Sequence, residues 1–79
     1  MAVAYVMINC DLGKEETVIK NLKQLSFVKE VHGTFGVYDI FAKVEHSEME
    51  RLREAITQGI RKTDFIRSTT TLMGIEGQS

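Results

Sequence analysis

The stretch VHGTFGVYDIFAKV, residues 31–44, predicts two strands joined by a tight glycine turn. We place the first strand over residues 31–35 and the second over residues 38–44, so that Gly36 and Val37 form the turn. Glycine readily adopts the positive φ that a short hairpin turn needs. Because successive side chains of a strand point to opposite faces, Asp39 lies on the more polar face, directly after the turn. A carboxylate beside the amides of a glycine turn is a candidate site for a small molecule.

Before the hairpin, the sequence predicts one strand and one helix. Residues 2–10 are a mostly apolar run with β-branched and aromatic members, which indicates a buried strand. In residues 14–25 the apolar side chains recur with helical spacing, and Asp11 is the expected N-terminal cap of this helix. The apolar stripe consists of Val18, Ile19, Leu22 and Leu25.

After the hairpin, the pattern of helix and strand repeats. Ser47 followed by Glu50 has the spacing of a capping box at the start of a second helix. Its apolar stripe consists of Met49, Leu52, Ile56 and Ile60. Residues 65–75, rich in threonine and isoleucine, predict a last strand.

The predicted order β-α-β-β-α-β defines the fold class. With right-handed crossovers it gives a four-stranded antiparallel sheet with both helices on one face, the ferredoxin-like arrangement of the α+β class. We expect residues 1–79 to form a single domain, because the chain is too short for two cores.

The sheet face without helices is expected to be apolar. Its predicted members are Tyr5, Met7, Phe41, Thr69, Thr71 and Met73. An apolar face of this kind is either a liability or an interface. We therefore expect a second subunit to cover it, which gives a dimeric αβ-barrel.

Composition excludes several classes of function. Lys and Arg number 10 against 11 Asp and Glu, so the chain lacks the basic excess of a nucleic-acid-binding protein. No apolar run reaches the roughly 18 residues that span a bilayer. The single cysteine, Cys10, excludes an internal disulfide and fits a reducing cytoplasm. Because His32 and His46 lack partners at metal-ligand spacing, we expect no metal and no cofactor.

Two interpretations of the polar residues stay open. Asp39 either binds a ligand's ammonium group or bonds the backbone of its own turn, and Tyr38 is expected to pack in the hairpin. A small barrel enzyme of the monooxygenase or isomerase type is the alternative function. Its available groups would be Asp39, His32 and Tyr5, but they form no recognisable catalytic constellation, so we expect no catalytic residue.

The run from Gly36 through Val37, Tyr38 and Asp39 resembles the "G-x-Y-D" signature of the effector-binding domain, or RAM domain, of Lrp/AsnC-type transcription regulators. The resemblance covers residues 2–76 and includes the approach to the hairpin and the final strand. The helix-turn-helix that normally precedes this domain is absent, so the chain resembles the stand-alone members found in archaea and bacteria.

The resemblance implies a non-catalytic module that binds an amino acid or a related effector. RAM domains form dimers through their sheets and assemble further, often into octamers, with the effector at the interface between dimers. Gly36, Val37 and Tyr38 would supply backbone groups, and Asp39 would meet the ammonium group. The polar residues expected from a neighbouring subunit are Thr69, Thr70 and Thr71. Phe35 stands where many of these regulators have threonine, which removes a hydroxyl and adds bulk. A full-length Lrp/AsnC regulator is the expected protein partner.

Overall fold

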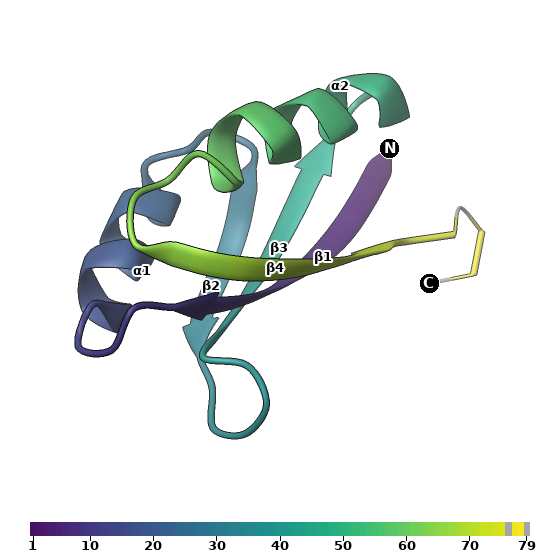
Figure 1. The fold of residues 1–79 in the computed structure, drawn as a ribbon. Coiled ribbons are helices and arrows are strands. Elements are labelled where there is room, and N and C mark those ends of the chain that lie inside the picture. Colours follow the sequence, from purple (N-terminus) through teal and green to yellow (C-terminus); the bar gives the residue numbers. More distant parts are fainter. Residues whose placement is uncertain (76, 79) are drawn as a thin grey trace.

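The computed structural model describes residues 1–75, 77 and 78. The element order confirms the predicted β-α-β-β-α-β arrangement (Figure 1). The four strands form one antiparallel sheet in the order β2-β3-β1-β4. The elements are β1 (Ala2–Cys10), α1 (Glu15–Lys23), β2 (Val28–Gly33), β3 (Ile40–His46), α2 (Met49–Ala55), a π-helical turn η1 (Ile56–Ile60) and β4 (Ile66–Met73).

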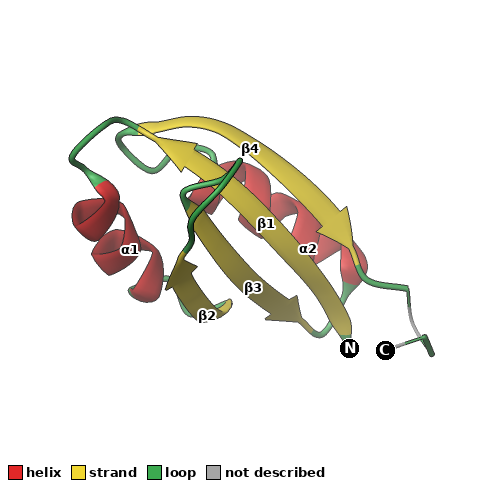
Figure 2. Cartoon of the chain, turned by 90° about the horizontal axis from the view of Figure 1, so that it is seen from below, coloured by secondary structure: helices red, strands yellow, loops and turns green. Residues whose placement is uncertain are grey.

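Both helices lie on one side of the sheet and enclose the core. Figure 2 shows the opposite, open face toward the reader, with α2 behind the sheet. The buried and half-buried residues of β1 alternate strictly, as expected for a strand with one covered face. The core consists of Ala2, Ala4, Val6, Ile8, Cys10, Val18, Leu22, Val31, Ile40, Ala42, Val44, Leu52, Ile56 and Ile60. Both predicted helical stripes therefore face this core.

Gly59, near the end of the second helix, lies close to an aromatic ring. A Cβ on Gly59 would lie 2.8 Å from Cζ of Phe27, in the loop before β2. The backbone N–H of Arg61 donates to the carbonyl of Ile56 over 3.1 Å, which is the wider spacing of a π-helical turn. Among the described residues, no helix is long and apolar enough to cross a bilayer.

The predicted helix caps are wrong. The Asp11 side chain makes no capping hydrogen bond, and its carboxylate lies 4.0 Å from Nε of Arg67. The predicted capping box is also missing, because the helix begins at Met49 and the Ser47 hydroxyl lies 3.3 Å from Nδ1 of His46. In both cases the group that was expected to cap the helix lies close to another side chain instead, Asp11 to Arg67 and Ser47 to His46.

The hairpin is longer at its turn than predicted. β2 ends at Gly33 and β3 begins at Ile40, so a six-residue loop, residues 34–39, replaces the tight two-residue turn. The N–H of Thr34 donates to the carbonyl of Asp39 over 2.8 Å and closes the base of this loop. The predicted alternation within β3 is nevertheless correct, since Ile40 and Ala42 are buried.

The predicted face of β4 is wrong. Thr69, Thr71 and Met73 pair with Ile8, Val6 and Ala4 of β1, and these partners face the helices. Paired residues of adjacent strands share a face, so the open face carries the other set from β4. That set is Ser68, Thr70 and Leu72. The register shifts between Asn9 and Cys10, and this shift decides which threonines point outward.

Candidate functional site

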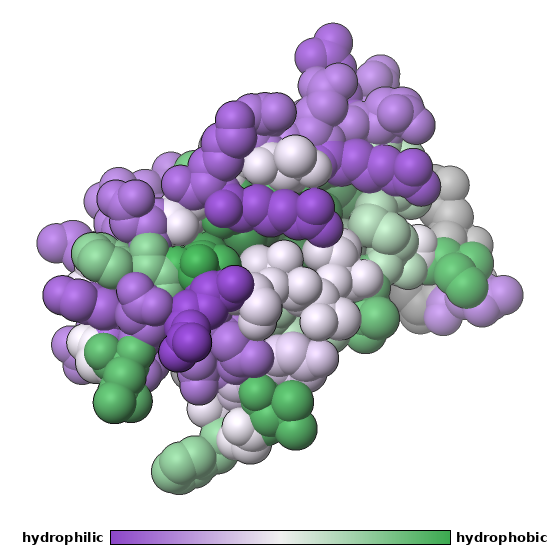
Figure 3. Space-filling model, viewed as in Figure 1, coloured by the Kyte–Doolittle hydropathy of each residue, from purple (hydrophilic) through white to green (hydrophobic). Residues whose placement is uncertain are grey.

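The loop between β2 and β3 projects from the open side of the sheet (Figure 1), and in Figure 2 it lies in front of the strands. Gly36 has φ +129°, a conformation that other residues rarely adopt, and a Cβ there would meet no atom within 4 Å. The glycine is therefore needed for the path of the backbone. Phe35 and Val37 on either side of it are 108% and 82% exposed, so the loop tip is apolar and uncovered. In Figure 3, which has the same view as Figure 1, apolar side chains stand out where this loop protrudes.

Asp39, at the base of the loop, is fastened to β1. Its Oδ2 accepts the backbone N–H of Cys10 over 3.0 Å, and its own N–H donates to the carbonyl of Ile8 over 3.0 Å. The side chain is half-buried. Among the described residues nothing donates a hydrogen bond to its second oxygen, Oδ1. The carboxylate therefore joins the loop base to β1 and keeps one oxygen for another donor.

Of the three predicted threonines, one lies beside the loop. The hydroxyl of Tyr38 donates to Oγ1 of Thr70 over 3.3 Å, which links the loop to β4 across the open face. Thr69 and Thr71 lie on the helix side of the same strand. Tyr38 itself belongs to the loop and not to β3.

A surface depression lies between the loop base and the start of β4. Its lining consists of Asn9, Cys10, Val37, Asp39, Arg67 and Ser68. Two of the predicted site residues, Val37 and Asp39, lie in this lining. The lining also contains Arg67, whose charge is opposite to that of Asp39, and polar side chains from β1 and β4. No motif in the sequence pointed to Arg67, since a single arginine near the start of a strand has no distinguishing neighbours.

Cys10 on the wall of this depression has a buried thiol. Burial raises the pKa of the Cys10 thiol, and the negative charge of Asp39 raises it further. The side chain is 5% exposed and belongs to the core. A buried thiol with a raised pKa carries little thiolate near neutral pH, so it is a poor nucleophile.

An aromatic row crosses the open face next to this site. The rings of Tyr5 and Phe41 stack with centroids 5.9 Å apart, and the ring of His32 stacks on Phe41 at 6.5 Å. Leu72 pairs with Tyr5 and remains 55% exposed. The prediction that Tyr5, Met7 and Phe41 lie on the open face is confirmed.

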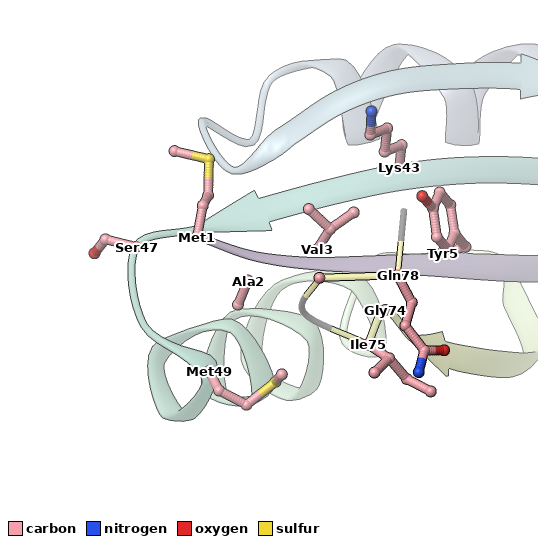
Figure 4. A pocket seen from close by; sticks show the side chains of 11 residues that line it. Met1, Ala2, Val3, Tyr5, Lys43, Ser47, Met49, Gly74, Ile75 and Gln78 are labelled. Carbon is pink, nitrogen blue, oxygen red and sulfur yellow. The ribbon is translucent and has the colours of Figure 1, made fainter.

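A second cavity, of about 380 Å³, lies at the other end of the open face (Figure 4). Tyr5 and Lys43 border it from the strands, and Ile75 and Gln78 border it from the segment after β4. Of the described residues that line it, none carries a carboxylate. The Lys43 amine already lies within 3.8 Å of two glutamates. The described lining of this cavity therefore offers no carboxylate as a counter-ion for an ammonium group.

The groups considered for an enzyme do not converge. Nε2 of His32 lies 3.2 Å from Oε1 of Glu30, whereas Asp39 is bound to Cys10 at the end of the sheet. In the described part of the chain, no hydrogen bond connects His32, Asp39 and Tyr5.

The sequence model of the Lrp/AsnC ligand binding domain matches residues 3–76, which is nearly the whole chain. The chain belongs to the Lrp/AsnC ligand-binding domain family. An HTH-type transcriptional regulator of Pyrococcus abyssi is 32% identical over 69 residues, which cover 87% of this chain and 44% of the regulator.

Solved structures agree with this membership in the Lrp/AsnC family. FFRP-DM1 superposes with a TM-score of 0.91 at 35% identity, and the match covers 95% of this chain and 100% of that one. A hypothetical protein of Pyrococcus horikoshii gives 0.91 at 33% identity, covering 99% and 94% of the two chains. Escherichia coli AsnC gives 0.88 at 25% identity, and this chain spans 53% of its length.

The matched family is the Lrp/AsnC ligand-binding domain, and this membership supports an effector-binding role. The chain spans about half the length of the two regulators. It matches the full length of FFRP-DM1.

Proposed function

We propose that this chain is a non-catalytic module that binds an α-amino acid or a related small effector at the base of the hairpin loop. Backbone groups of Gly36, Val37 and Tyr38 would surround the effector, and Asp39 would bind its ammonium group. Thr70, which contacts Tyr38, is the threonine best placed to contribute.

The observation that carries the proposal is the half-satisfied carboxylate of Asp39. Oδ2 is held by the Cys10 N–H, which fixes the direction of the side chain, and Oδ1 has no donor among the described residues. A fixed carboxylate is a stronger ammonium partner than a mobile one, since less side-chain entropy is lost on binding. Charge-assisted hydrogen bonds of this kind are about twice as strong as neutral ones.

We propose further that copies of the chain associate through the open face. The stacked rings and Leu72 form an apolar strip that a second sheet would bury, giving the dimeric αβ-barrel. The uncovered loop tip at Phe35 and Val37 offers a separate contact between dimers, which supports assembly into a higher oligomer such as an octamer.

The partner in regulation would be a full-length Lrp/AsnC protein. The chain matches only 44% of the Pyrococcus regulator and 53% of AsnC, so those proteins contain a second part that this match does not cover. A mixed assembly, in which this chain binds such a regulator through the same sheet face, would make the regulator respond to effector bound to this chain.

A thermal-shift panel of the twenty L-amino acids tests effector binding. An effector at about 100 times its dissociation constant stabilises the folded state by about 2.7 kcal/mol, which raises the melting temperature by roughly 10–20 °C. Asp39→Asn should abolish the shift, whereas the exposed control Asp64→Asn should preserve it. A panel that shifts nothing, or a shift that survives Asp39→Asn, would contradict the proposal.

A further inference from the structure

We infer that Arg67 is the carboxylate-binding residue of the effector site, so that the depression selects zwitterionic α-amino acids by binding both of their charges. This inference rests on the proposed function and names the group that would determine its specificity. Asp39 and Arg67 lie on the wall of the same depression, one from the loop base and one from β4.

Arg67 is placed there by an irregularity in the sheet. Asn9 pairs with Ser68, and the next residue of β1, Cys10, pairs with Ile66. Arg67 is therefore the extra residue of a β-bulge in β4. Bulges redirect a side chain out of the normal alternation of a strand, and they are frequent beside functional sites.

The same bulge connects the two charges through the backbone. Cys10 pairs with Ile66, the residue directly before Arg67, and the Cys10 N–H is the donor to the Asp39 carboxylate. The backbone of the guanidinium-bearing residue and the bond that holds the carboxylate are therefore both at the Cys10 end of β1. An α-amino acid carries its two charges on adjacent carbon atoms, so it needs such neighbouring counter-ions.

Arg67 is free to exchange its present partner for a ligand. Its Nε lies 4.0 Å from Oδ1 of Asp11, and the two side chains are 70% and 52% exposed. Exposed ion pairs at this separation contribute little to stability, because water screens them. A ligand carboxylate in the depression would instead accept two parallel N–H bonds from the planar guanidinium. Asn9 and Ser68 supply further hydrogen-bonding groups on the same wall.

Calorimetric titration separates this assignment from the proposed function. Each L-amino acid that shifts the melting temperature is titrated alongside its own carboxamide, which keeps the ammonium group and the side chain but lacks the negative charge. The proteins are wild type, Arg67→Gln and Arg51→Gln. Arg51 is the matched control, since its Nε also lies in a loose, exposed pair, 3.9 Å from Glu48.

We expect Arg67→Gln to weaken binding of the amino acid by about tenfold or more, with little change for the carboxamide. Arg51→Gln should bind both as wild type does. Urea unfolding of each variant checks that the fold is retained. If the wild type binds an amino acid and Arg67→Gln binds it equally well, or loses amino acid and carboxamide alike, the role of Arg67 is wrong while the proposed function stands. If no amino acid binds the wild type, the proposed function itself fails.

Discussion

Asp39 joins the hairpin to β1, so removing its carboxylate is expected to destabilise the fold even without an effector. Its Oδ2 is the acceptor for the Cys10 N–H at 3.0 Å, and the Cys10 residue is 5% exposed. Asp39→Ala leaves this buried donor without a partner. An unsatisfied buried donor costs about 1–3 kcal/mol. In a domain of this size each kcal/mol lowers the melting temperature by about 4–8 °C.

The matched variant is Asp39→Asn, whose side-chain oxygen can accept the same N–H. It should cost about 1 kcal/mol or less, since it exchanges a charge-assisted bond for a neutral one. The assay is urea unfolding followed by circular dichroism at one fixed protein concentration, because self-association changes apparent stability by mass action. An Asp39→Ala protein within about 0.5 kcal/mol of wild type, or one no less stable than Asp39→Asn, would refute this reasoning.

Three further predictions concern other parts of the molecule. Phe41→Glu places a charge in the aromatic row of the open face and should shift the sedimentation coefficient toward that of the monomer, whereas the exposed control Gln58→Glu should not. Equal sedimentation of the two variants would argue against the sheet-face dimer. Gly59→Ala forces a Cβ to within 2.8 Å of the Phe27 ring and should lower the free energy of unfolding by about 1–3 kcal/mol, with Gln58→Ala as the neutral control in the same urea assay. Because burial and then the Asp39 charge raise the pKa of Cys10, its thiol should react slowly with a disulfide reagent at pH 8 and rapidly only after unfolding. Fast reaction of the native protein would contradict the burial of Cys10.

The parts of the fold that depend on hydrophobic periodicity were predictable. Residues 2–10 were expected as a strand, and β1 has those bounds. The stripes that contain Leu22 and Leu52 both face the core. Burial of an apolar face is the largest contribution to stability. The spacing of the apolar residues that form this face can be recognised in the sequence of an amphipathic helix or a half-covered strand.

The face of β4 was not predictable, because both of its faces are polar enough to be exposed. In the run Ser68, Thr69, Thr70, Thr71, either alternation places hydroxyls outward. Which alternation faces outward depends on the pairing with β1 and on the bulge opposite Cys10, and neither can be recognised from the residues of β4 alone. The same bulge explains why the position of Arg67 was missed.

The loop and the caps were mispredicted for a related reason. Glycine at position 36 signals a turn but does not fix its length, and the loop closes only where Thr34 bonds the carbonyl of Asp39. The expected cap residue Ser47 instead contacts the ring of His46. Local signals of this kind name the candidate groups, and tertiary contacts decide which of them are used.

The site containing Asp39 is tested most directly by amide chemical-shift mapping of deuterated, ¹⁵N-labelled protein during titration with an amino acid identified in the thermal-shift panel. We predict saturable shifts at residues 36–39, at Cys10, whose N–H is bonded to Asp39, and at Arg67. Shifts confined to the cavity beside Tyr5 and Lys43, with the Cys10 amide unmoved, would contradict the account.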